Sequence, residues 1–373
     1  MTPAELSRTV LRSVRGAVAE QELSVPVPAR IVVQQPPRPG CGDYASNVAL
    51  QLAGPAGRPA REVAEILRKR LVDSAGIARV EIAGPGFLNF TLGDGAQVAL
   101  VREVLAQGDG YGDRAAGRDP VARVLPVGHE PAAGADADAS ADAGAGAGVR
   151  EAVVAEALAR IEAAAGLPHG RGADDRRADH RTDGRPADHR TDNRPAHVPA
   201  PYDLGTLIAR LGVDEARWVL LRPAAHDRVQ VPERPVQRES NPRFRVQYAC
   251  ARSRALVRNA DELGFAAEPG DVGESTVEAP AGESAADVLH AHLAAYPSVV
   301  EVAARRRAPD RVVRHLEATA DAYFRWHDVQ PPLPVGEQKP LAVHRARLAL
   351  AEAAGTVLAN GLRLLGISAP EHL

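Results

Sequence analysis

The chain has 373 residues and is short of several residue types, and each shortage excludes a class of protein. Its only cysteines are Cys41 and Cys250, which are too few for a disulfide framework or a cysteine-based zinc site. No run of eighteen apolar residues occurs, so the sequence predicts no membrane-spanning helix. The first residues are typical of a capped helix start and not of a basic leader. We therefore expect a cytoplasmic protein without a membrane partner.

Lysine is equally scarce, because Lys69 and Lys339 are the only two in the chain. Arginine therefore carries nearly all of the positive charge, although coding bias explains this as well as RNA binding does. The formal net charge is −3 at pH 7. Hydrophobic residues make up 45% of the chain, which is enough for two or three domains with cores of their own.

Residues 1–110 alternate between helical and strand patterns, which predicts a small α+β domain. Thr2, Pro3 and Glu5 form a capping box before an apolar stripe, so a helix is expected to open the chain. The sequence further predicts helices at 43–52, 61–72 and 98–105, and strands at 31–33, 80–82 and 87–92.

Residues 111–202 are predicted to form a linker that is mostly of low complexity and disordered. The hexapeptide Ala-Asp-His-Arg-Thr-Asp occurs at 178–183 and again at 187–192. Such repeats could bind a metal, but they lack the apolar residues of a rigid frame, so a disordered spacer without a metal site is favoured. The other features expected here are an Ala-, Gly- and Asp-rich stretch at 131–149, a strand at 121–125 and an isolated helix at 150–165.

Residues 203–373 show helical periodicity almost throughout, interrupted by an acidic loop at 261–287. Helices are expected at 203–212, 213–221, from 242 onward, and at 284–296, 298–307, 311–327 and 341–365. The predicted fold class is therefore multi-domain, with a small α+β N-terminal domain, a disordered low-complexity middle and an all-α helical-bundle C-terminal domain.

The helix expected from Pro242 is the most informative element, because it combines basic and aromatic side chains. Asn241 suits the N-cap, and Pro242 suits the first helical position. Six arginines and one glutamate lie between Arg238 and Arg258, a local charge of +5 in a chain of net charge −3. A basic helix with aromatic rings fits a folded RNA, since arginine binds phosphates and rings stack on unstacked bases. The alternative is an ordinary solvated helix face.

The stretch Asn241-Pro-Arg-Phe-Arg-Val-Gln-Tyr-Ala-Cys-Ala-Arg-Ser253 resembles the segment that opens the helical, DALR-type anticodon-binding domain of arginyl-tRNA synthetases. The family pattern is Asn-Pro, aromatic residues and Val-Gln-Tyr-Ala-His-Ala-Arg. This chain has Arg245 where the family usually has an aromatic residue, and Cys250 where it usually has histidine. The ending at 358–373 also resembles the family, with Leu373 in the place of a methionine found near the anticodon.

Residues 42–52 and 82–90 resemble the additional N-terminal domain of the same family, which contacts the D-loop of tRNA. In the family an aromatic residue and an asparagine, two apart on a strand, lie near an unstacked base. The D-loop-binding residues implied by the resemblance are Phe87, Asn89, Tyr44 and Asn47. The alternative is that Phe87 belongs to the core and Asn89 merely ends a strand.

The resemblance also implies a set of residues that contact the anticodon loop. These are Asn241, Phe244, Gln247, Tyr248, Arg252, Trp326 and Asp328. The alternative here is that rings such as those of Tyr248 and Trp326 pack in the core of the bundle.

The catalytic motifs of the family are missing from this sequence. The family uses His-x-Gly-His and a Lys-Met-Ser-Lys loop to supply positive charge during ATP-dependent activation of the amino acid. The nearest string is Pro126-Val-Gly-His129, and no lysine lies between Lys69 and Lys339. Residues 120–200 are also too few and too polar for a nucleotide-binding sheet. The sequence therefore predicts no catalytic residues and no cofactor.

Three functions follow from these observations. The first is a stand-alone tRNA-binding relative of arginyl-tRNA synthetases without aminoacylation activity, whose two modules are joined by the flexible linker. Its expected partner is tRNA, specifically tRNA-Arg, with no DNA partner. The second is an arginine–tRNA ligase that uses ATP as a cofactor. The third is a regulatory subunit that binds a full-length synthetase.

Overall fold

The computed structural model describes residues 3–34, 36, 42–74, 76–93, 95–114, 148–167, 203–234, 238, 240–273 and 284–373. The predicted strand at 121–125, the histidine repeats and most of the Ala-, Gly- and Asp-rich stretch lie outside these residues. The chain forms two compact units. The first unit comprises Met1–Gln107, Ser253–Ala295 and Asp321–Ala354, and the second comprises Gly108–Arg252, Tyr296–Ala320 and Gly355–Leu373.

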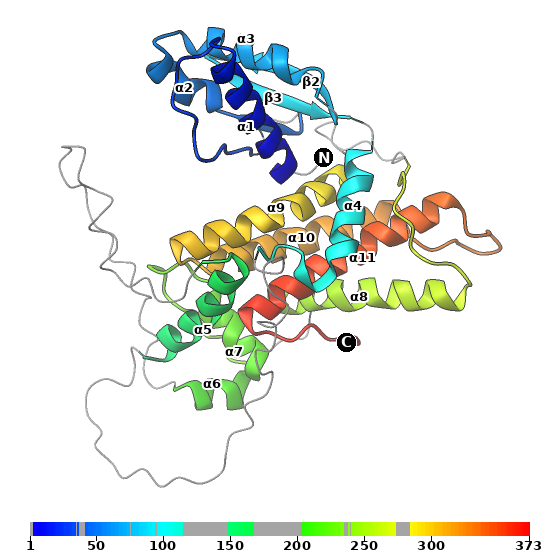
Figure 1. Ribbon diagram of the computed structural model, residues 1–373. Coiled ribbons are helices and arrows are strands. Elements are labelled where there is room, and N and C mark those ends of the chain that lie inside the picture. The colour runs from blue at the N-terminus through cyan, green and yellow to red at the C-terminus, as the bar shows by residue number, and fades with distance from the viewer. Residues whose placement is uncertain are drawn as a thin grey trace. The chain divides into compact units, whose positions relative to one another are not determined.

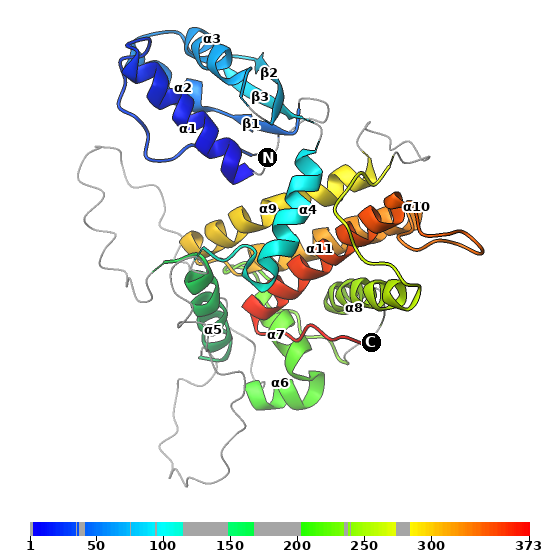
Figure 2. The same cartoon turned by 45° about the vertical axis from the view of Figure 1, so that its right-hand side comes forward.

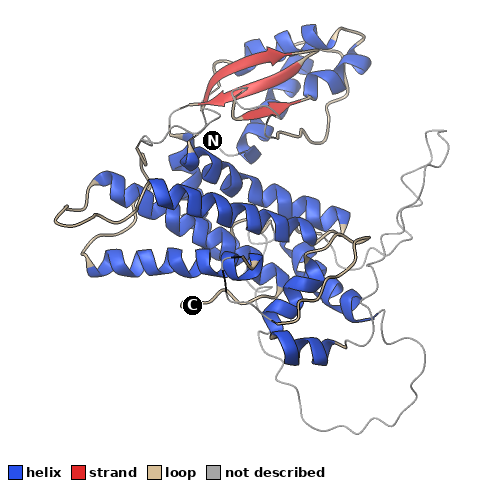
Figure 3. Ribbon diagram, turned by 180° about the vertical axis from the view of Figure 1, so that it is seen from behind, coloured by secondary structure: helices blue, strands red, loops and turns tan. Residues whose placement is uncertain are grey.

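The first unit begins with an α+β fold, as the sequence predicts. Its helices are α1 (Pro3–Ala19), α2 (Val48–Ala56) and α3 (Ala60–Leu71), and its strands are β1 (Tyr44–Ser46), β2 (Ile77–Ala83) and β3 (Phe87–Leu92). The strands form an antiparallel sheet in the order β1-β3-β2. The helices cover one face of this sheet (Figures 1 and 3).

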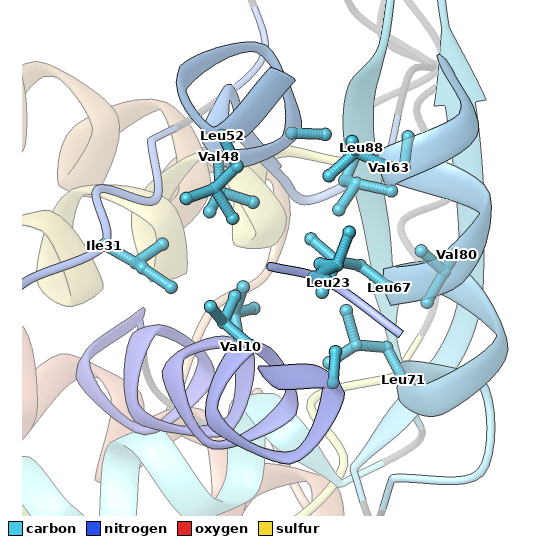
Figure 4. Packing of buried hydrophobic residues seen from close by; sticks show 14 of the residues in the cluster. Val10, Leu23, Ile31, Val48, Leu52, Val63, Leu67, Leu71, Val80 and Leu88 are labelled. Atoms are coloured by element: carbon cyan, nitrogen blue, oxygen red, sulfur yellow. The ribbon is translucent and has the colours of Figure 1, made fainter. Parts of the chain in front are cut away.

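Apolar residues at helical spacing make the core between these helices and the sheet. Val10 of α1 and Leu67 of α3 are fully buried, and they meet Leu88 of β3 in one hydrophobic cluster (Figure 4). Because Leu88 alternates with Phe87 and Asn89 along β3, the core face takes Leu88 and leaves the other two on the opposite face. The core therefore determines which side chains the sheet can offer to a ligand.

Two predictions in this region are wrong. The helix expected at 43–52 begins only at Val48, because residues 44–46 pair with β3 as β1. The strand expected at 31–33 is not formed, and the backbone of Gln34 makes only an isolated bridge to Ala45. Ile31 is nevertheless buried in the hydrophobic cluster, so its apolar character reflects packing and not strand pairing.

Helices make up most of the remaining described chain. They are α4 (Ala96–Gln107), the 3-10 turn η1 (Gly108–Gly110), α5 (Gly148–Ala164), α6 (Leu204–Leu211), α7 (Val213–Leu221), α8 (Pro242–Glu262), α9 (Ala285–Arg306), α10 (Asp310–Val329) and α11 (Ala342–Leu365). The sequence predicts two helices where α9 runs unbroken through Pro297. The N-cap of α6 is Asp203, whose carboxylate accepts a hydrogen bond from the Thr206 amide at 2.7 Å.

Among the described helices, α11 is long and apolar enough by composition to cross a membrane. However, 72% of its most apolar window is buried inside the protein. Its apolar length therefore reflects its position in the core of the helical bundle.

The helix predicted as isolated at 150–165 is α5, and it is not isolated. It packs beside α7 in the second unit (Figures 1 and 2). Its Arg150 side chain is 2% exposed and donates hydrogen bonds to five backbone carbonyls. These carbonyls belong to Leu220, Pro223, Ala224, Ala225 and Asp227. Helix α5 is therefore an integral part of the helical fold.

Residues 108–114 make hydrogen bonds within the second unit. The Arg114 amide donates to the carbonyl of Ala164 at 2.7 Å, and Asn360 Nδ2 donates to that of Gly108 at 2.9 Å. Residues 108–114, α5 and α6 thus all belong to the second unit. The chain enters this unit at Gly108, directly after α4.

Candidate nucleic-acid interface

The open face of the sheet presents two of the predicted D-loop residues together. Phe87 and Asn89 lie two apart on β3 and on the same face, opposite Ala83 and Ala45 of the neighbouring strands. The Phe87 ring is 37% exposed, whereas Asn89 is only 8% exposed. The ring of Phe87 therefore offers a stacking surface, with the amide of Asn89 held beside it.

The other two predicted D-loop residues do not join this pair. Tyr44 is opposite Phe90 in the β1–β3 pair, so it lies on the core face and packs against the hydrophobic cluster. Burial raises the pKa of the Tyr44 hydroxyl, and the nearby Asp43 carboxylate raises it further. Asn47 is exposed at the start of α2, where its Oδ1 accepts from Gln51 Nε2 at 3.1 Å. The Tyr44 side chain is therefore half-buried against the core, and its contact with the D-loop stays a prediction.

Helix α8 carries three of the predicted anticodon residues as one stripe. Phe244, Tyr248 and Arg252 follow one another at intervals of four residues, so they lie on one side of the helix. The rings of Phe244 and Tyr248 are nearly parallel, with centroids 6.0 Å apart and an interplanar angle of 8°. Both rings are half-buried, and Arg252 is exposed. This stripe combines stacking surfaces with a cation.

Asn241 has a structural role at the start of α8. Its Oδ1 accepts a hydrogen bond from the Arg243 amide at 3.0 Å, as the sequence predicts for an N-cap. Its Nδ2 donates to the Glu215 carboxylate at 2.8 Å. Both ends of the amide are thus engaged within the protein, and its assignment as an anticodon contact stays a prediction.

Gln247 is also engaged inside the protein and is only 2% exposed. Its Nε2 donates to the Asp214 carboxylate at 2.8 Å and to the Ser368 carbonyl at 2.9 Å. Its Oε1 accepts from the guanidinium of Arg243, which in turn donates to the Glu215 carboxylate. The Ser368 amide and hydroxyl both donate to Asp214. Gln247 therefore links α7 and the C-terminal tail, and its predicted role at the anticodon stays a prediction.

Sequence reasoning missed the members of this network, which are Asp214, Glu215, Arg243 and Ser368. The available signal was the pair of adjacent acidic residues in the first turn of α7. An N-terminal turn favours acidic side chains for electrostatic reasons alone, so that signal does not identify their partners.

Trp326 and Asp328 lie in the part of α10 that belongs to the first unit. The Trp326 side chain is fully buried and packs near Tyr323, with ring centroids 6.1 Å apart. This burial favours the alternative that the Trp326 ring packs in the core of the bundle, and its role at the anticodon stays a prediction. The Asp328 side chain is 77% exposed and remains available to a ligand.

Comparison with known proteins matches both the N-terminal α+β region and the C-terminal helical region to protein families. A model of the arginyl tRNA synthetase N terminal domain matches residues 8–92, and one of the DALR anticodon binding domain matches residues 246–373. An arginine–tRNA ligase of Frankia alni is 30% identical over 558 aligned positions that cover 100% of both chains. The chain belongs to the arginyl-tRNA synthetase family. Another arginine–tRNA ligase, from Renibacterium salmoninarum, is 29% identical over 556 positions, again with 100% of both chains covered.

The arginyl-tRNA synthetase fold is also visible in three dimensions. The solved arginyl-tRNA synthetase of Thermus thermophilus matches with a TM-score of 0.60 and 14% identity, covering 100% of each chain. The alignment with the Frankia alni relative spans 558 positions, although this chain has only 373 residues. Many positions of that family alignment therefore face no residue of this chain. Among the described residues, no group of three His, Cys, Asp or Glu side chains is placed to hold a metal ion.

Proposed function

We propose that this member of the arginyl-tRNA synthetase family is a cytoplasmic tRNA-binding protein that does not itself attach arginine to tRNA. Two surfaces support tRNA binding. The open sheet face offers Phe87 beside Asn89, and α8 offers Phe244, Tyr248 and Arg252 in one stripe. Partly exposed rings next to a cation suit unstacked bases and the phosphates that flank them.

The proposal that the chain does not attach arginine to tRNA rests on its length, which is shorter than the alignment with its relatives. The relatives align from end to end, yet about a third of the 558 aligned positions lack a residue here. The sequence also has no His-x-Gly-His motif and no lysine between Lys69 and Lys339. Activation of an amino acid by ATP needs preorganised positive charge at the phosphates. The chain lacks the motif and the lysines with which the family supplies this charge.

Two assays on the purified chain test the proposal together. A filter-binding titration should detect binding of tRNA-Arg, and affinity should fall steeply as salt is raised, because phosphate contacts release counterions. An arginine-dependent exchange of pyrophosphate into ATP, with tRNA present, should remain at the level of a blank. Exchange above the blank would overturn the claim of inactivity, and a flat titration would overturn the claim of tRNA binding.

A second candidate is an arginine–tRNA ligase that uses ATP. It is favoured by the names of the relatives and by their end-to-end coverage of this chain. The exchange assay separates the two candidates directly. Binding to a full-length synthetase in place of tRNA is the remaining alternative, and sequencing of the RNA that copurifies with the chain would distinguish it and identify the tRNA.

We expect Phe87→Ala to weaken tRNA binding by about 1–2 kcal/mol, because loss of one ring–base stack costs an amount of this order. The folded state should be little affected, since the ring is 37% exposed. Filter binding measures the affinity, and circular dichroism verifies the fold. The matched control is Val72→Ala, which truncates a 43% exposed apolar side chain at the end of α3. Equal affinities for the two variants would exclude Phe87 from the interface.

A further inference from the structure

We infer that the second unit contains a separate groove that binds the phosphate backbone of RNA. This inference rests on the proposed tRNA binding and assigns an additional contact surface to it. The groove has a volume of about 1030 Å³. It is lined by α7, by the segment that follows it, by the start of α8 and by α10. None of the predicted D-loop residues lines it, and of the predicted anticodon residues only Asn241 does.

The buried guanidinium of Arg150 holds one wall of the groove in place. Residues 222–234 supply much of the lining, and Arg150 holds the first part of this segment from behind. The five carbonyl bonds of its guanidinium range from 2.7 to 3.4 Å. At the far end of the segment, Arg210 donates to the carbonyls of Pro232 and Glu233 at 3.2 and 3.0 Å. The segment is therefore fixed at both ends before any ligand binds, which reduces the entropy lost on binding.

The charges that line the groove leave two arginines available. Arg222 is paired with Glu317 at 2.7 Å, and the other lining arginine of α10, Arg314, is paired with Asp310. Among the described residues, the exposed Arg228 and Arg234 have no ion-pair partner. Positive charge therefore exceeds negative charge along this wall. The guanidinium of Arg150, which is bonded to the same segment, adds to the positive charge.

The remaining acidic side chains of the groove do not cancel this excess. Glu215 is 5% exposed and is neutralised by Arg243. Asp227 is exposed, and its carboxylate lies 3.5 Å from Nε2 of His226. One free carboxylate thus stands against two free guanidinium groups.

The chemistry of the groove favours an extended polyanion over a compact nucleotide. The half-buried apolar side chains of Val231 and Pro232 lie among the charged ones, where a ribose can pack between two phosphates. The start of α8 is not itself an anion site, because Asn241 already accepts from the amide of Arg243. The cavity also exceeds the space that one small ligand usually fills. An RNA backbone can instead run along the groove and place successive phosphates near Arg228 and Arg234.

The test compares tRNA binding by the full chain with that of the double variant Arg228→Gln/Arg234→Gln over a salt series. We expect the affinity at low salt to fall about tenfold, and the slope of log affinity against log salt to become shallower by about one to two. The matched control is Arg12→Gln/Arg15→Gln, which removes the same charge from the exposed side of α1. Circular dichroism should show all three proteins equally folded.

The outcomes separate this inference from the proposed function. If the groove variant binds tRNA with the same affinity and salt slope as the wild type, the groove is not an RNA site, although the proposed tRNA binding still stands. Equal losses in the groove variant and the α1 control would also overturn it, because they indicate a diffuse charge effect. A wild-type chain that binds no tRNA overturns both. A third arm measures ATP binding by the wild type and by the groove variant. If the variant loses ATP binding but keeps tRNA binding, the groove binds a free nucleotide and the RNA ligand is rejected.

Discussion

Substitution of Arg243 by methionine is expected to lower the free energy of unfolding by about 3–5 kcal/mol, because it strands a buried charge. Arg243 and Glu215 have side chains that are only 10% and 6% exposed, and they form an ion pair. Without the guanidinium, the Glu215 carboxylate keeps only its hydrogen bond from Asn241. The methionine also removes the donor to Gln247 Oε1. Urea unfolding followed by far-ultraviolet circular dichroism measures the loss.

An exposed ion pair of the same unit provides the control. Arg222 and Glu317 are joined at 2.7 Å, but their side chains are 53% and 22% exposed. Arg222→Met should therefore cost less than about 1 kcal/mol. The double substitution of Arg243 and Glu215 by methionine should recover much of the loss, since it removes both charges at once. A single Arg243 variant no less stable than the Arg222 control would show that the buried network does not hold α7 to α8.

The second large effect is expected for Arg150→Met, which keeps the aliphatic volume but removes every donor. We expect a loss of about 3 kcal/mol, because several backbone carbonyls lose a charged hydrogen-bond partner at once. Burial lowers the pKa of Arg150, but a guanidinium remains protonated at neutral pH. The amide of Asp227, which donates to the Ala224 carbonyl at 2.9 Å, should exchange its hydrogen faster in the variant.

Arg210→Met is the matched control for this experiment. Arg210 also donates to backbone carbonyls, those of Pro232 and Glu233, but it does so from a more exposed position. Water can replace its hydrogen bonds, so the cost should be about 1 kcal/mol. Urea unfolding and hydrogen exchange of both variants give the comparison. An Arg150 variant that unfolds at the same urea concentration as the wild type would contradict the role of this residue as an anchor.

Helices were predictable where a long apolar stripe decided the structure. Helices α3, α6, α7 and α11 begin and end close to their predicted bounds, because periodic leucines and valines need only a neighbouring core. The prediction failed at 43–52, where pairing with β3 overrides the helical pattern of the first residues. It failed again at Pro297, which the long helix α9 accommodates within its length. Both failures arise because the structure of these residues depends on contacts with distant parts of the chain, which the local sequence pattern does not reveal.

The candidate site was predictable only in part, for a related reason. The strand alternation of Phe87 and Asn89 and the four-residue spacing of Phe244, Tyr248 and Arg252 are local properties, and the structure retains both. Whether a polar side chain faces solvent or a partner depends on residues far away in the chain. Asp214 and Ser368 are separated by 154 positions, and no local feature of either one indicates their contact.

The anchoring of residues 108–114, α5 and α6 within one unit has a consequence for how such a chain can change over time. Arg114 is tied to Ala164 at the end of α5, while Asp203 caps α6 in the same unit. These contacts involve no residue of 115–147 or 168–202, so the number of residues in those two ranges can change without breaking them.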